Sequence, residues 1–328
     1  MRTLVKLSLI ATIPLAISIL QLTTRSVPAA KVSIIASQSD STYGPANLIA
    51  PGTKPVMISK QFEFTEGPAA DAKGNVYFTD QPNSTIWKYG TDGKLSLFTD
   101  KAGRSNGTFF DAKGHLVTCA DDQGELWRFD ATGRQHETLL TGVDGKRLNG
   151  PNDLWMDARG GIYFTDPYYQ RNYWTRTTSA LDGEKVYYLP AGRHEPIVAS
   201  SALLKPNGIA GSRDGKYLFV ADIKAGKTYR FTIGTKGELT DQQLFTKMGS
   251  DGMTLDDEGN VYLTGGKGVT IFDPQGNKLG LIRIEEPWTG NVCFGGPDRR
   301  TLFITASKAI YTVNMKVKGS TKNAQKLR

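Results

Sequence analysis

Cysteine and histidine are scarce in this chain of 328 residues, which contains two cysteines and three histidines. Cys119 and Cys293 are too far apart to form a CxxC metal or redox motif. Both lie in apolar, strand-like runs, so we expect buried free thiols, with a disulfide as the alternative in an oxidising compartment. His115, His136 and His194 are expected at the surface, which leaves no histidine for a catalytic triad.

Several sequence patterns of common enzyme classes are also missing. The chain has no Gly-x-Ser-x-Gly, no HExxH and no phosphate-binding glycine loop, which disfavours serine hydrolases, zinc peptidases and nucleotide enzymes. Helical periodicity is absent beyond the first 30 residues. With 36 glycines and 39% hydrophobic residues, the composition is typical of a globular protein rich in turns and argues against disorder.

The formal charge of +8 comes from the two ends of the chain. The first 30 residues carry three basic residues and residues 316–328 carry five, and neither segment contains an acidic residue. The intervening body is therefore neutral and lacks the clustered basic surface that binds nucleic acid. We expect the basic tail, residues 316–328, to be a solvated end.

The first 30 residues have the pattern of a secretory signal peptide. Arg2 and Lys6 precede an apolar run over residues 7–20, and small residues at 27–30 offer a cleavage site. The run is shorter than the roughly 20 residues of a membrane-spanning helix, and Pro14 interrupts it. The pattern predicts export to the periplasm or the exterior, with no stable membrane insertion after cleavage.

An internal repeat organises the rest of the chain. A polar residue begins an apolar stretch that reaches a turn eight residues later, and five of the six turns end on glycine. Successive polar residues are 40 to 55 positions apart, the length of a four-stranded propeller blade. The six residues that begin the repeats are Glu66, Asn106, Asn152, Asn207, Asp251 and Asn291.

Two further runs of β-branched and aromatic residues follow each turn and read as strands. The pattern predicts a six-bladed β-propeller over residues 31–315. The last repeat lacks a final strand, which residues 55–58 can supply, so an N-terminal strand should close the last blade and remove a free sheet edge.

In a propeller the first strand of each blade lines the central channel, so the six polar residues should meet at one end of it. They offer only oxygen ligands, two of them carboxylates, which suits a hard cation such as Ca²⁺ better than Mg²⁺. Zn²⁺ and Mn²⁺ remain open. For any one position the alternative is a side chain that merely caps its strand.

Six stretches of the chain resemble the regucalcin (senescence marker protein) and gluconolactonase family: TEGP at 65–68, KRLNGPND at 146–153, IYFTDP at 162–167, KPNG at 205–208, SDGM at 250–253 and CFGGP at 293–297. The resemblance implies metal ligands at Glu66, Asn152, Asn207 and Asp251 and a general base at Asp251. It leaves Asn106 and Asn291 as channel-lining residues that contact substrate. Asp153 and Asp166 are the next candidates for the base.

The third repeat is the longest, and its extra residues should lie beside the metal. Tyr168 and Arg171 in this aromatic and basic segment suit stacking on a sugar-like ring and binding a carboxylate.

The implied activity is metal-assisted hydrolysis of a small sugar lactone such as gluconolactone. Two alternatives stay open. One is a promiscuous phosphotriesterase or arylesterase on the same ion, and the other is a non-catalytic propeller that binds a metal or ligand.

Overall fold

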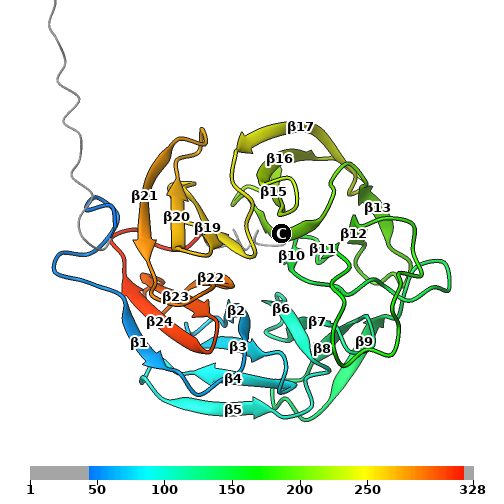
Figure 1. Cartoon of the computed structure of the whole chain (residues 1–328), viewed down its shortest axis with the longest axis horizontal. Helices are drawn as coiled ribbons and strands as arrows, with labels where there is room; N and C mark the ends of the chain where they lie inside the picture. The colour runs from blue at the N-terminus through cyan, green and yellow to red at the C-terminus, as the bar shows by residue number, and fades with distance from the viewer. Residues whose placement is uncertain (1–43, 321–328) are drawn as a thin grey trace, which may run out of the picture. The chain divides into compact units, whose positions relative to one another are not determined.

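The computed structural model describes residues 44–320, in which all the regular structure is β-strand. Twenty-four strands form six antiparallel sheets of four strands each. The sheets surround a central axis, with β2, β6, β10 and β22 towards the centre and β1, β5, β9, β13, β17 and β21 at the rim (Figure 1). The predicted six-bladed propeller is confirmed.

Consecutive strands form the first five blades, and each is listed from the channel outwards. Blade one is β2 (Thr65–Ala70), β3 (Val76–Asp80), β4 (Thr85–Tyr89) and β5 (Leu95–Thr99). Blade two is β6 (Ser105–Phe110), β7 (Leu116–Ala120), β8 (Glu125–Phe129) and β9 (His136–Leu140). Blade three is β10 (Leu154–Met156), β11 (Ile162–Asp166), β12 (Lys185–Leu189) and β13 (Ile197–Ser200).

Blade four is β14 (Pro206–Gly211), β15 (Tyr217–Asp222), β16 (Lys227–Ile233) and β17 (Leu239–Thr246). Blade five is β18 (Met253–Leu255), β19 (Val261–Gly265), β20 (Gly268–Phe272) and β21 (Lys278–Arg283). Blade six combines β22 (Asn291–Gly295), β23 (Thr301–Ala306) and β24 (Ala309–Asn314) with β1 (Val56–Ser59).

The strand β1 closes the ring. It runs antiparallel to β24, with Val56 opposite Thr312 and Met57 opposite Tyr311. The predicted closing strand, residues 55–58, is thus displaced by a single residue. Pairing the first strand with the last removes the free edge that β24 would otherwise present.

The basic tail begins as part of the propeller and not as a solvated end. Residue Gly319 forms a β-bridge with Asp256, and the side chain of Val317 is buried. The backbone N–H of Ser320 donates to the carbonyl oxygen of Leu255 at 2.9 Å. The expectation of a solvated tail was therefore wrong for residues 316–320, while residues 321–328 lie outside the described part.

The turn between the first and second strands of a blade explains why the repeat ends on glycine. In blade one, Asp71 accepts hydrogen bonds from the backbone of Lys73 and Asn75, both at 2.9 Å, and Gly74 has φ 89°. This left-handed conformation costs glycine little because it lacks a Cβ atom. The sixth repeat has Arg299 at this position with φ 61°, so the geometry of the turn is kept without glycine.

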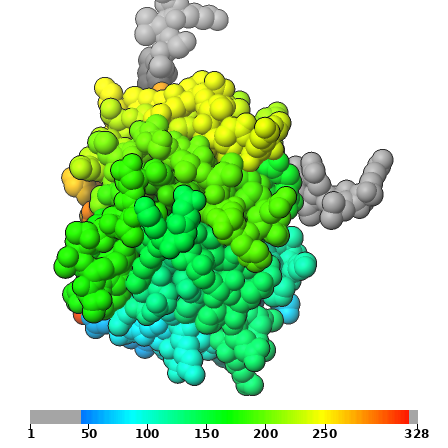
Figure 2. Space-filling view, turned by 90° about the vertical axis from the view of Figure 1, so that its right-hand side faces the viewer, coloured from blue at the N-terminus to red at the C-terminus, as the bar shows by residue number. Residues whose placement is uncertain are grey.

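The core lies between the blades. Six clusters of buried side chains occur in the described residues, and each is shared by two neighbouring sheets. Between blades six and one, for example, Phe303 packs on Phe78 with ring centroids 5.5 Å apart. From the side, the second, third and fourth blades form successive bands from cyan-green to yellow (Figure 2).

Both cysteines are free, with Cys119 buried and Cys293 partly buried, as the sequence favoured. His136 in the outer strand β9 and His194 in the turn between β12 and β13 are exposed, and His115 in the turn between β6 and β7 is partly exposed. The ring of His136 stacks on Trp127 at 3.7 Å between ring centroids. Within residues 44–320 no helix is long and apolar enough to cross a membrane. The predicted signal segment lies outside these residues, so cleavage and export stay predictions.

We expect Phe303→Ala to lower the free energy of unfolding by about 3–5 kcal/mol, because it leaves a cavity at the joint between the first and last blades. Leu97→Ala is the control, since Leu97 is 49% exposed on an outer strand. Urea unfolding followed by tryptophan fluorescence measures both. Equal losses in the two variants would contradict the assignment of this joint to the core.

Candidate functional site

The six polar residues that begin the repeats lie at one end of the channel. Asn106, Asn207 and Asn291 belong to the inner strands β6, β14 and β22, as Glu66 does to β2. Asn152 and Asp251 lie two residues before β10 and β18. Asp251 is partly exposed, whereas the other five residues are between 1 and 5% exposed.

Glycines allow the inner strands to converge at this end. A Cβ atom on Gly67 would lie 2.0 Å from the carbonyl oxygen of Asn106, and one on Gly252 would lie 2.0 Å from the side chain of Asn291. Such distances are far below van der Waals contact, so any larger residue would push the neighbouring blade away. In four of the six repeats the residue after the initial polar residue is glycine, and the next blade lies against it.

Asp251 is held by two donors from neighbouring segments. The amide Nδ2 of Asn207 donates to its Oδ1 at 2.9 Å, and the indole Nε1 of Trp288 donates to its Oδ2 at 2.5 Å. Trp288 lies between β21 and β22 and was not predicted, because a lone aromatic residue in a connecting segment carries no signal of its position. Burial raises the pKa of Asp251, and the two donors oppose this shift.

Glu66 is the second carboxylate of the site. Its Oε2 accepts the backbone N–H of Gly67 at 3.0 Å. Burial raises the pKa of Glu66 well above its ordinary value, and the nearby carboxylates of Asp251 and Asp153 raise it further. Carboxylates this close repel each other in a medium of low dielectric constant, and a cation between them would relieve that repulsion.

The amide oxygen of Asn207 fits the same cation. Its Oδ1 is buried without a hydrogen-bond partner, although its Nδ2 has two acceptors. A buried polar atom without a partner is costly unless something outside the protein chain occupies the site. No three His, Cys, Asp or Glu side chains in residues 44–320 gather into a metal-binding group, so an ion here would need amide oxygens.

Asp153 and Asp166, the reserve candidates for the base, have different surroundings. Asp153 lies in the channel, where the amide of Asn291 approaches its Oδ2 at 3.4 Å, and burial raises its pKa to about 7. Asp166 instead accepts the backbone N–H groups of Asn149 and Gly150, both at 2.9 Å. Asp166 therefore has a structural role in holding the segment that enters blade three.

The segment between β11 and β12, residues 167–184, reaches the site through Tyr169. The hydroxyl of Tyr169 accepts a hydrogen bond from Asn207 Nδ2 at 2.9 Å, and the guanidinium of Arg171 lies 5.5 Å from the centroid of the Tyr169 ring. Tyr168, which the sequence favoured, bonds to Gln170 instead. Two adjacent tyrosines cannot be distinguished from sequence, since only the path of the loop decides which one turns inwards.

Residues 64–308 match the family described as the SMP-30/gluconolactonase/LRE-like region. The chain belongs to this family. It is 28% identical to a gluconolactonase of Zymomonas mobilis, over 80% of this chain and 82% of that protein. A lactonase of Staphylococcus aureus is 26% identical over 80% of this chain and 86% of its own length. The solved structure of a Xanthomonas campestris gluconolactonase superposes with a TM-score of 0.76 at 28% identity, covering 82% and 91% of the two chains.

The raised pKa of Asp153 makes the stability of the metal-free protein depend on pH. Its pKa is about 7 when folded against an ordinary value of 3.8, so the folded state keeps a proton that the unfolded state loses. The stabilisation that this proton gives the folded state is fully present below the unfolded pKa of 3.8 and is lost as the pH rises through the folded pKa of about 7. We expect Asp153→Asn to remove this pH-dependent stabilisation.

The measurement is the Tm with excess chelator from pH 4 to pH 8. The difference in Tm, variant minus parent, should grow with pH across this range. A difference that stays constant would show that Asp153 ionises normally in the folded protein.

Proposed function

We propose that this protein hydrolyses a sugar lactone, with gluconolactone as the first candidate, at the mouth of the propeller channel with a divalent cation bound there. The chain is an enzyme of the gluconolactonase type by its family and its named relatives. The particular lactone, the metal and the roles of the residues are the proposal. The product would be the open-chain hydroxy acid.

One observation carries the choice of a metal-dependent hydrolase over a binding protein. Two carboxylates, Glu66 and Asp251, lie close enough together that each affects the ionisation of the other, beside the unpaired amide oxygen of Asn207. Glu66, Asn152, Asn207 and Asp251 would hold the ion. Carboxylate and amide oxygens in an irregular set suit Ca²⁺, which accepts such coordination more readily than Mg²⁺.

When bound, Ca²⁺ would supply a Lewis acid that polarises the lactone carbonyl. Asp251 would accept a proton from the attacking water and later return it to the ring oxygen as the C–O bond breaks. Trp288 donates to one oxygen of Asp251 and Asn207 to the other, so two donors fix the orientation of this carboxylate. Asn106 and Asn291, buried at the same end of the channel, would contact the hydroxyl groups of a sugar ring.

The wall of the proposed pocket is the blade-three segment. Tyr169 presents a hydroxyl at Asn207, and Lys205 lies 4.4 Å from the centroid of its ring. We assign the predicted stacking role to Tyr169 in place of Tyr168, and we keep Arg171 as a group for the developing carboxylate.

Removal of the metal should destabilise and inactivate the protein together. An ion bound only by the folded state stabilises it by about 2.7 kcal/mol at a hundred times its Kd, so chelation should lower the Tm by several degrees. The test follows acid release from a panel of lactones, with a phosphotriester for comparison, before and after chelation and on return of Ca²⁺, Zn²⁺ or Mn²⁺. An unchanged melting curve would contradict a structural metal, and turnover of the phosphotriester alone would favour that activity.

Substitution separates ligation from catalysis at the two carboxylates. Asp251→Asn keeps an oxygen ligand but cannot accept a proton, so we expect the rate at saturating Ca²⁺ to fall by about a hundredfold to ten-thousandfold. Glu66→Gln should act mainly through metal affinity, and excess Ca²⁺ should partly restore its rate.

Turnover of both variants across a Ca²⁺ titration measures the two effects. Recovery of Asp251→Asn to nearly the parent rate would make Asp251 a ligand only. Asp153 would then be the next residue to test as the base.

A further inference from the structure

Asp121 departs from a pattern that blades one, three and four share. In blades one, three and four the second strand ends in aspartate, and that carboxylate accepts backbone N–H groups of the segment entering its own blade: Asp80 from Glu63 and Phe64, Asp166 from Asn149 and Gly150, and Asp222 from Leu204 and Lys205. Blade two has Ala120 at that position, and Asp121 follows it. The carboxylate of Asp121 turns instead to side chains of its neighbours.

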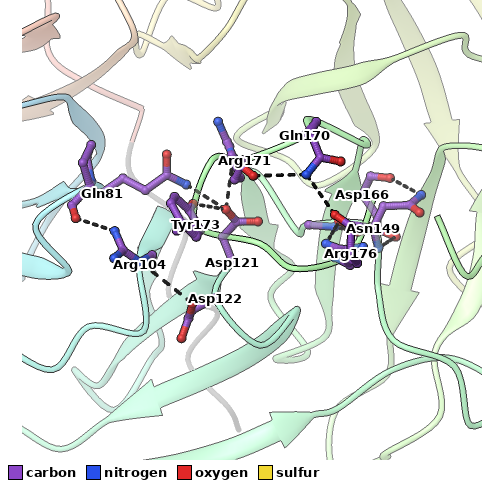
Figure 3. Close-up of polar contacts among 12 residues, drawn as sticks. Gln81, Arg104, Asp121, Asp122, Asn149, Asp166, Gln170, Arg171, Tyr173 and Arg176 are labelled. Atoms are coloured by element: carbon purple, nitrogen blue, oxygen red, sulfur yellow. Dashed lines mark hydrogen bonds and ion pairs between the residues drawn. The ribbon is translucent and has the colours of Figure 1, made fainter. Parts of the chain in front are cut away.

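Three side chains from two other blades meet at Asp121. Its Oδ2 accepts hydrogen bonds from Arg171 Nε at 3.1 Å, Tyr173 hydroxyl at 2.5 Å and Gln81 Nε2 at 3.4 Å (Figure 3). The side chain of Asp121 is only 1% exposed. A carboxylate buried this deeply needs a positive partner, and Arg171 is that partner.

The same contacts lead to the proposed catalytic site. Arg171 donates to Asp121 through Nε, and its guanidinium lies over the ring of Tyr169, whose hydroxyl meets Asn207. Within residues 44–320 the hydrogen bond that the guanidinium of Arg171 forms is the one from Nε, and its Nη atoms form none. Asp121 thus fixes the direction of the guanidinium and leaves its outer nitrogens for a ligand.

A second contact ties the segment to blade two. The ring of Tyr173 lies under the guanidinium of Arg104 at 4.1 Å from the ring centroid, and Arg104 is two residues before Asn106. One carboxylate therefore orients two residues of the blade-three segment, Arg171 and Tyr173.

The segment has little regular backbone structure. Between Tyr168 and Arg176 its only backbone to backbone hydrogen bond runs from Trp174 N–H to Arg171 carbonyl at 3.3 Å. Gln170, Asn172 and Thr175 are exposed. With so little regular structure, the position of the segment depends on side-chain anchors. Lys205 donates to the carbonyl oxygen of Tyr168 at 2.7 Å, Asn207 donates to the Tyr169 hydroxyl at 2.9 Å, and Arg176 donates to the carbonyl oxygen of Asn149. Between Tyr168 and Arg176, Asp121 is the anchor that binds two residues of the segment, Arg171 and Tyr173.

We propose that Asp121 is a positioning residue for the lactonase reaction. Its carboxylate holds Arg171 and Tyr173, so that the blade-three segment forms the substrate-binding wall beside the proposed metal ligands. This inference rests on the proposed function. Asp121 acts through the segment and has no contact of its own with the reacting atoms.

The test compares Asp121→Asn with the parent enzyme. We expect KM for the lactone to rise about tenfold, the loss expected when a buried charge-assisted hydrogen bond is weakened. The rate at saturating substrate and the Ca²⁺ affinity should stay within about twofold, because metal and base are held by other elements. Hydrogen exchange in peptides covering residues 167–176 should become faster.

Asp71→Asn is the matched control. Asp71 also accepts three hydrogen bonds within the propeller, but in the turn at the far end of blade one. It should lower the Tm without changing KM or the exchange of residues 167–176. If Asp121→Asn fails to fold, Tyr173→Phe tests the same anchor, since it removes only the hydroxyl that bonds to Asp121.

A double variant tests whether the rise in KM of Asp121→Asn comes from the loss of its contact with Arg171. Adding Asp121→Asn to Arg171→Gln should raise KM little further, because both changes break the same contact. Additive effects, or an unchanged KM with unchanged exchange in Asp121→Asn, would overturn the inference. A parent enzyme that hydrolyses no lactone would overturn the proposed function instead, while the exchange measurement would still decide whether Asp121 holds the segment.

Discussion

The close approach of the six inner strands around the channel axis is the constraint on which the rest of this structure depends. At Gly67, Gly252 and Gly290 even a methyl group would collide with the neighbouring blade. In five of the six blades the polar residue that faces the channel is next to a glycine, which leaves room for the neighbouring blade; in blade three Asn152 lies between Pro151 and Asp153. The same convergence takes carboxylates and amides out of water and into one small volume. Packing of the blades and chemistry of the site therefore have a common origin, and a change that loosens the ring at this end would disperse the polar groups as well.

Convergence also determines the electrostatics of the site. Each carboxylate at the channel mouth has a raised pKa because of burial, and for Glu66 the neighbouring carboxylates add to this effect. Without a cation the folded state must keep protons or tolerate repulsion. If a divalent ion binds here as proposed, it would relieve this repulsion, and its affinity would depend on pH because protons and metal would compete for the same oxygens.

The repeat allowed the sequence to predict the fold and the residues that begin each blade, because both follow from a local pattern that recurs six times. It also predicted the closing strand, since one blade was a strand short. The sequence could not predict the positions of three residues, and the physical reason is the same for Tyr169, Trp288 and Asp121. Each lies in a connecting segment, and its direction is decided by a contact with a residue distant in sequence: Asn207 for Tyr169, Asp251 for Trp288 and Arg171 for Asp121. The prediction of a solvated basic tail was wrong for a similar reason. The charged side chains indicated exposure to solvent, but the backbone at Gly319 pairs with Asp256 of blade five.

The pairing of β1 with β24 has a consequence for the order of events during synthesis. Of the strands that the structure describes, the one made first, Val56–Ser59, has the one made last, Ala309–Asn314, as its partner. Blades one to five can each form from contiguous chain, but the sixth can form only after residues 309–314 have been made. Until then the backbone groups of β1 have no partner strand, so the ring stays open while the first five blades fold.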